Sequence, residues 1–226
     1  MSHCDRSRKS GSNSIVGSLL NNACISQLSM LAWRWLTNSL VRSRARRNDM
    51  TVVDTLAERN DDFARTRFAP GLPMLPRLRT LVVGCVDPRV DPAHVLGLET
   101  GDAAVIRNVG GRVTPDVLAE LVLLGRLARS LVGSAAPVID LIVMQHTDCG
   151  ITRLQDPPDM LAAYFHVDPT ALVHKHVSEP RAAVASDIAV VQGVPQLAAA
   201  FRVTGVVYDV DTGHIDIVHS GEKESA

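Results

Sequence analysis

Two short stretches of the chain hold residues whose types and spacing suit a metal ion. Cys85, Asp87 and Arg89 alternate just after one apolar run, and His146 and Cys149 lie three positions apart just after another. Two thiolates and one imidazole form a donor set that Zn²⁺ accepts in tetrahedral geometry. Three protein ligands leave a fourth position for water or substrate, as in catalytic zinc sites. The sequence therefore predicts one Zn²⁺ per subunit, held by both cysteines and the histidine.

Asp87 and Arg89 predict an oriented carboxylate beside this metal. A guanidinium two residues away can pair with Asp87 and keep it ionised. Asp87 would then accept a hydrogen bond from a zinc-bound water or hydroxide. If the pair breaks, Asp87 becomes a candidate fourth ligand that closes the site. The alternatives are a surface ion pair, worth about 0–1 kcal/mol, and cysteines that are merely buried and inert.

The segments before these residues read as strands that would position them. Residues 81–83 and 138–144 are nearly unbroken apolar runs, typical of parallel strands that are covered on both faces. In open α/β sheets, functional groups gather where strands end at their carboxyl edge. Residues 103–107 predict another strand, and Gly110 and Gly111 after it allow the backbone to pass close to another group.

The remaining patterns predict helices and a terminal hairpin. Thr114 is a good N-cap for a long helix that Gly133 ends. Residues 203–208 and 214–219 predict two antiparallel strands joined by a turn. Further helical patterns cover residues 51–67, 94–98, 186–192 and 195–201, and residues 153–180 are irregular or helical. The predicted fold class is α/β, with a central, mainly parallel β-sheet flanked by helices and a C-terminal antiparallel edge hairpin.

Composition limits the classes of protein to consider. The chain of 226 residues is 46% hydrophobic, which is ample for a core. Four cysteines are too few for a secreted disulfide framework, so we expect a reducing, cytoplasmic compartment. No apolar run reaches about 18 residues, so we predict no membrane span.

The charges are unevenly distributed along the chain. Residues 1–49 carry eight of the 23 Lys and Arg residues and two of the 24 Asp and Glu residues, which leaves a net charge of −7 on residues 50–226. Nucleic-acid affinity needs clustered cations, so we expect no nucleic-acid partner. We predict a basic extension, residues 1–49, disordered or helical, and a catalytic domain, residues 50–226. The extension could be an accessory or non-native segment, a targeting segment, or a membrane-surface or partner helix.

Other polar residues have simpler interpretations. Asp91 and Asp148 are interpreted as turn or capping residues. Four of the histidines outside the two motifs are interpreted as solvent-exposed, with His94 as a surface or capping residue: His94, His166, His174 and His176.

The two motifs together resemble a known enzyme family. Residues 85–89, CVDPR, and residues 146–150, HTDCG, resemble the motifs of the β-class carbonic anhydrases, and residues 107–117, RNVGGRVTPDV, resemble a further segment of that family. The resemblance covers about residues 50–220. It implies Zn²⁺ on Cys85, His146 and Cys149, with Asp87 and Arg89 as a catalytic dyad. It also implies that the Gly150 amide helps to hold bicarbonate.

The resemblance implies a carbonic anhydrase, a zinc lyase that reversibly hydrates CO₂ to bicarbonate and a proton through zinc-bound hydroxide. It also implies a homodimer or homotetramer. Two alternatives stay open. The same scaffold could hydrolyse CS₂ or COS, because a zinc-bound hydroxide could attack those carbon atoms too. The chain could also be a non-catalytic zinc-binding or redox-responsive protein, in which oxidation of a cysteine ligand expels the metal.

Overall fold

The structure is a computed structural model that describes residues 50–133 and 138–220. The chain divides into two compact units, Met1–Pro70 and Gly71–Ala226, and we treat each separately.

Helix α2, Val52–Thr66, is the described element of the first unit. It begins at a capping box: the Asp54 N–H donates to Thr51 Oγ1, and the Thr51 N–H donates to the Asp54 carboxylate. The helix predicted over residues 51–67 is therefore confirmed. Residues 1–49 lie outside the described residues, so the basic extension and its boundary at residue 50 stay a prediction.

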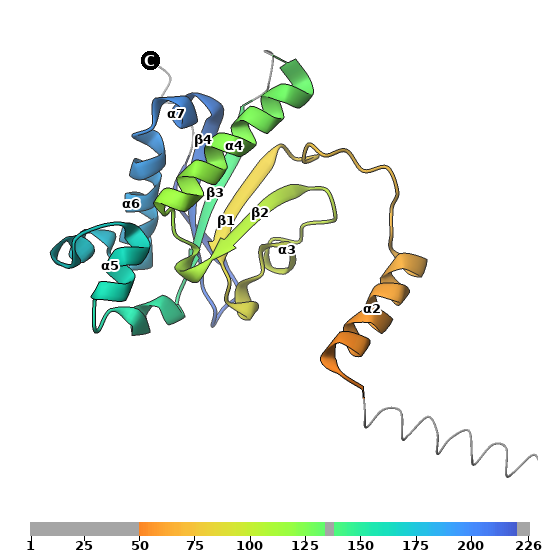
Figure 1. Ribbon diagram of the computed structural model, residues 1–226, viewed down its shortest axis with the longest axis horizontal. Helices are drawn as coiled ribbons and strands as arrows, with labels where there is room; N and C mark the ends of the chain where they lie inside the picture. The colour runs from red at the N-terminus through yellow and green to blue at the C-terminus, as the bar shows by residue number, and fades with distance from the viewer. Residues whose placement is uncertain (1–49, 134–137, 221–226) are drawn as a thin grey trace, which may run out of the picture. The chain divides into compact units, whose positions relative to one another are not determined.

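A five-stranded sheet forms the centre of the second unit (Figure 1). In spatial order the strands are β2 (Ala103–Asn108), β1 (Thr80–Cys85), β3 (Ile139–His146), β4 (Phe201–Tyr208) and β5 (Ile215–His219). The first four run parallel, and β5 runs antiparallel to β4 at the edge. The predicted fold class, including its edge hairpin, is confirmed.

Three helices cover one face of this sheet: α4 (Pro115–Val132), α6 (Pro180–Gln192) and α7 (Pro195–Ala200). Helix α4 begins at Thr114, whose Oγ1 accepts from the Val117 N–H, and Gly133 ends it, as predicted. No helix within the described stretches is both long enough and apolar enough to cross a bilayer.

Alternating side chains of the buried strands separate two cores. Leu81 and Val83 face the helices, whereas Val82 between them faces the opposite side, because successive strand residues point to opposite faces. Helix α3, Pro92–Val95, packs near that opposite side. It begins earlier than the helix predicted over residues 94–98, because the Asp91 side chain caps it and Pro92 suits its first position.

A small third core lies beyond the end of β3. It joins the 3₁₀ segment η4 (Gly150–Leu154), helix α5 (Asp159–Phe165) and the 3₁₀ segment η5 (Pro169–Lys175). Its buried residues are Ile151, Leu161, Phe165, Leu172 and Val177. Residues 153–180, which the sequence predicted to be irregular or helical, thus pack around a hydrophobic cluster of their own.

Candidate metal centre

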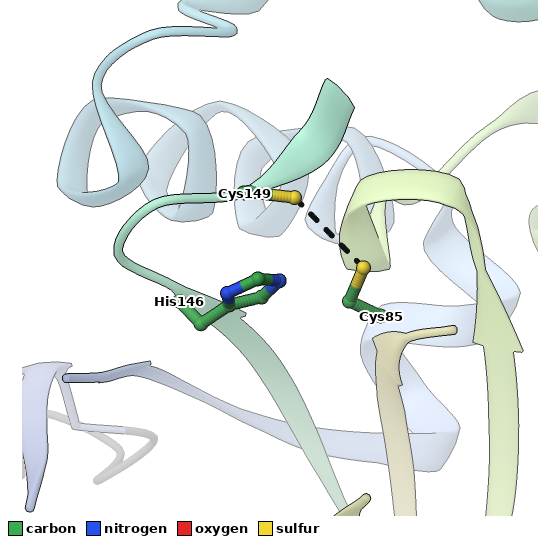
Figure 2. A group of neighbouring side chains, drawn as sticks. All are labelled: Cys85, His146 and Cys149. Atoms are coloured by element: carbon green, nitrogen blue, oxygen red, sulfur yellow. Dashed lines mark hydrogen bonds between the residues drawn. The ribbon is translucent and has the colours of Figure 1, made fainter. Parts of the chain in front are cut away.

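The structure brings three metal-binding side chains together at the carboxyl edge of the sheet. Val83 of β1 pairs with Val143 of β3, so the two strands end side by side. Cys85 ends β1, His146 ends β3, and Cys149 follows in the next turn. Their donor atoms lie within 4.8 Å of one another, and Figure 2 shows the imidazole and both sulfur atoms turned toward one region.

The spacing of these donors fits Zn²⁺. The two Sγ atoms are 3.8 Å apart. Two thiolates at about 2.3 Å from a tetrahedral zinc ion would be about 3.8 Å apart. His146 Nδ1 lies 2.8 Å from the Thr147 carbonyl oxygen, whereas its buried Nε2 has no hydrogen-bond partner among the described residues. A proton on Nδ1 would leave the Nε2 lone pair free for a metal.

Asp87 and Arg89 form a close ion pair beside these donors. Arg89 Nη2 lies 2.8 Å from Asp87 Oδ2, and Nε lies 3.1 Å from Oδ1. The Arg89 backbone N–H also donates to Oδ1, at 2.9 Å, because Asp87 caps the 3₁₀ segment η1, Pro88–Val90. The Arg89 side-chain hydrogen bonds lower the pKa of Asp87 to about 2. Asp87 is therefore an ionised acceptor held by Arg89, and its role as a fourth ligand stays a prediction.

Comparisons with known proteins agree with this geometry. The sequence profile of the carbonic anhydrase family matches residues 80–168. A crystal structure of carbonic anhydrase from Streptococcus mutans superposes with a TM-score of 0.58 and 30% identity, over 75% of this chain and 99% of that one. The chain belongs to the β-class carbonic anhydrase family. Beta-carbonic anhydrase 1 of Mycobacterium tuberculosis is 37% identical over 107 residues, which cover 47% of this chain and 60% of that relative's length.

A relative with a different name also matches this chain. The carbon disulfide hydrolase of an Acidianus species is 27% identical over 187 residues, which cover 71% of this chain and 85% of the length of that hydrolase. The relatives that match this chain therefore include proteins named for two different activities, and the similarity alone does not choose between them.

Backbone amides support the Cys85 sulfur. The Asp87 N–H lies 3.4 Å from Cys85 Sγ, and the Asp87 and Gly110 amides both help to lower the pKa of Cys85. Gly110 lies in η2, Val109–Gly111, which follows β2. A Cβ atom on Gly111 would lie 2.8 Å from the Met144 carbonyl oxygen and 2.9 Å from the Cys85 nitrogen. The close backbone approach predicted for the paired glycines is confirmed.

The Cys85 and Cys149 thiols interact strongly with each other. The hydrogen bond between the sulfurs lowers the pKa of Cys85 to about 4, and the same contact, together with burial, raises the pKa of Cys149. Burial lowers the pKa of His146, but its interaction with the Cys85 thiolate outweighs this and leaves a net rise. A divalent cation between the two sulfur atoms would favour the thiolate form of both cysteines.

Sequence reasoning did not identify Arg107 as part of this centre. Arg107 Nε donates to the Cys85 carbonyl oxygen and Nη2 to the Asp87 carbonyl oxygen, both at 2.8 Å. Its Nη1 lies 2.7 Å from Asp91 Oδ2. Arg107 thereby fixes the turn after β1. The only signal in the sequence was a cation near the end of a predicted strand, and the fold then pairs Arg107 in register with Gly84 of β1.

Two acidic residues do more than cap turns. Asp91 caps α3, as predicted, and also binds Arg107. Asp148 binds Arg89 through its side chain and its carbonyl oxygen. The four histidines interpreted as solvent-exposed are exposed and lie outside the metal centre: His94, His166, His174 and His176.

A buried polar network lies behind the centre and was also missed. Arg112 and Asp187 form an ion pair in which each side chain is 1% exposed. Asp187 also accepts from Gln145 Nε2 at 3.0 Å and from the Val113 N–H at 3.1 Å. The network connects β3, next to His146, with helix α6 and the turn after η2.

Proposed function

We propose that the chain is a zinc enzyme that reversibly hydrates CO₂ to bicarbonate and a proton. The observation that supports this most directly is the three-donor centre beside an ionised Asp87. Cys85, His146 and Cys149 would hold the zinc ion. When bound, Zn²⁺ lowers the pKa of a coordinated water and so supplies a nucleophile near neutral pH.

Asp87 and Arg89 would act as the catalytic dyad. A carboxylate with a depressed pKa accepts hydrogen bonds and cannot donate them near neutral pH. Asp87 would therefore accept a hydrogen bond from the attacking oxygen and direct a lone pair of that oxygen toward CO₂. Arg89 keeps this carboxylate ionised and in place, because its Nε donates to Oδ1 and its Nη2 donates to Oδ2.

Gly150 is proposed as a substrate-binding residue. It begins η4, and the first amides of a helical turn have no partner within that turn. Its N–H would donate to an oxygen of bicarbonate.

A direct test is stopped-flow CO₂ hydration by the zinc-loaded chain. We expect activity in the parent and a loss of at least about 100-fold in Asp87→Asn, because an amide cannot accept at both positions. Asp140→Asn is a matched control, since Asp140 pairs with Arg202 at the opposite end of β3. Activity that survives unchanged in both Asp87→Asn and Cys149→Ser would exclude the assigned roles.

A second candidate function is hydrolysis of CS₂ or COS. The Acidianus relative, named carbon disulfide hydrolase, matches 71% of this chain and most of its own length. Release of H₂S from CS₂ by a preparation that does not hydrate CO₂ would favour this function. A preparation that binds zinc and turns over none of these substrates would instead support a non-catalytic or redox-responsive zinc protein.

We also propose that the enzyme is a homodimer or homotetramer in the cytoplasm. Sedimentation equilibrium of the zinc-loaded chain would give the oligomeric state, and fractionation of the source cells would give the compartment. The same fractionation would test whether the basic extension, residues 1–49, targets the protein to another compartment.

A further inference from the structure

Asp148 is a second acidic partner of Arg89, in addition to Asp87. Its Oδ2 lies 2.9 Å from Arg89 Nη1, and its carbonyl oxygen lies 3.0 Å from Nη2. Its side chain is 65% exposed, so burial does not fix its position. Its two hydrogen bonds with Arg89 hold the side chain and the carbonyl group in place.

The backbone of Asp148 adopts a conformation that serves these contacts. Its φ is 50°, in the left-handed region. That conformation costs a residue with a Cβ about 1–2 kcal/mol, although Asp and Asn tolerate it best. It allows the carbonyl and the carboxylate of one residue to reach the same guanidinium.

Arg89 consequently joins the turn after β1 to the turn after β3. Its Nε and Nη2 bind Asp87, and its Nη1 and Nη2 bind Asp148. The Arg89 side chain is 48% exposed, so it would be free to move into solvent if one side released it. Asp148 itself lies between the ligands His146 and Cys149.

We propose that Asp148 is a positioning residue, which holds the Arg89 guanidinium against Asp87 and so keeps the dyad paired. This inference rests on the proposed function, in which the dyad orients the attacking water. Asp148 touches neither substrate nor metal in this role. If Asp148 were only a turn residue, replacing it would change turnover only through its effect on folding.

The test replaces Asp148 by Gly, which keeps the left-handed backbone and its carbonyl but removes the carboxylate. We expect kcat/KM for CO₂ to fall about 10-fold, while the Kd for zinc, measured by competition with a chromophoric chelator, stays within about twofold of the parent. His166→Gly is the matched control, because His166 is also an exposed residue with a left-handed φ, of 52°. It should retain parental kcat/KM. Asp148→Asn, which keeps a neutral acceptor, should lie between Asp148→Gly and the parent.

A double-mutant cycle separates positioning from a structural role. In an Arg89→Ala background, Asp148→Gly should cause no further loss, since Asp148 acts only through Arg89. Equal losses in both backgrounds would overturn the proposal. So would zinc affinity that falls in step with kcat/KM, or an unchanged kcat/KM in Asp148→Gly.

A crystal structure of zinc-loaded Asp148→Gly gives a readout that does not need turnover. We expect the Arg89 guanidinium to leave Asp87, and an unmoved Arg89 overturns the positioning role. If the zinc-loaded parent hydrates no CO₂, the proposed function fails, and the position of Arg89 in these crystals still decides the inference.

Discussion

Arg112 and Asp187 form a fully buried ion pair although 75 residues separate them in the sequence. Arg112 Nε lies 2.8 Å from Asp187 Oδ2, and Nη2 lies 3.0 Å from Oδ1. The guanidinium also stacks over the Phe165 ring, at 4.9 Å from its centroid. One pair of charges thus links the turn behind the zinc ligands, helix α6 and the small core around α5.

Loss of one partner of this pair should destabilise the protein strongly. Asp187→Ala leaves the Arg112 charge, the Val113 N–H and the Gln145 amide without their acceptor. We expect the free energy of unfolding to fall by about 3–5 kcal/mol, because an uncompensated buried charge remains. Urea denaturation followed by circular dichroism measures this change.

The exposed pair between Arg202 and Asp140 provides the comparison. Its side chains are 56% and 34% exposed, so Asp140→Ala should cost about 0–1 kcal/mol. Equal effects of Asp187→Ala and Asp140→Ala would show that the buried network does not hold the second unit together.

Gly111 should be sensitive to a single added methyl group. In Gly111→Ala the Cβ would lie within 3.0 Å of backbone atoms of Met144, Cys85 and Gly84, so the Cys85 backbone must move. We expect at least about a 10-fold weaker Kd for zinc, as for other changes in the support of metal ligands. Competition with a chromophoric chelator measures it.

Gly97 is a matched control for this substitution. Its φ is 63°, close to the 62° of Gly111, but a Cβ there meets no atom within 4 Å. Gly97→Ala should therefore show only the backbone cost of about 1–2 kcal/mol, with unchanged zinc affinity. If both variants bind zinc like the parent, the close contact at Gly111 does not position Cys85.

The metal centre could be predicted because its information is local in sequence. Residues 85–89 and 146–149 each follow an apolar run, and parallel strands bring such ends to one edge of the sheet. The Gly110–Gly111 pair was equally readable, because a positive φ and a close backbone approach both require glycine.

The residues that support the centre could not be predicted, because their partners are distant in sequence. Arg107 appears as an ordinary strand-end cation until β2 lies beside β1. Asp187 appears as a polar residue on a helix until α6 packs over the sheet and buries it against Arg112. A charged residue inside an apolar helical pattern was the available signal, but a sequence alone does not name the residue that neutralises it.

Zinc binding should stabilise the folded chain. Free zinc at about 1,000 times its Kd should add about 4 kcal/mol, because the ligands meet only in the folded state. Urea midpoints of the parent with zinc and with a chelator would measure this difference. In Cys149→Ser the midpoint should respond much less to zinc. A response equal to that of the parent would place the ion elsewhere.

Asp102 should make stability depend on acid pH. Its side chain is 7% exposed and accepts from the Glu99 N–H at 3.0 Å and from Arg77 Nε at 2.8 Å. The Glu99 amide, followed by Arg77, lowers the pKa of Asp102. Because the folded pKa is below the unfolded value of about 3.9, ionised Asp102 stabilises the fold above that value. This stabilisation is lost as pH falls through the folded pKa.

Asp102→Asn should therefore have a lower urea midpoint than the parent at neutral pH, and the difference should shrink below about pH 4. Zinc release at low pH acts on both proteins, so the difference between them reports on Asp102. Glu99→Gln is the control, since the Glu99 side chain is 81% exposed and makes just one long contact, of 3.4 Å, with Arg77 Nη2. It should match the parent at every pH. A difference for Asp102→Asn that stays constant into strong acid would show that shape, and not charge, is what Asp102 contributes.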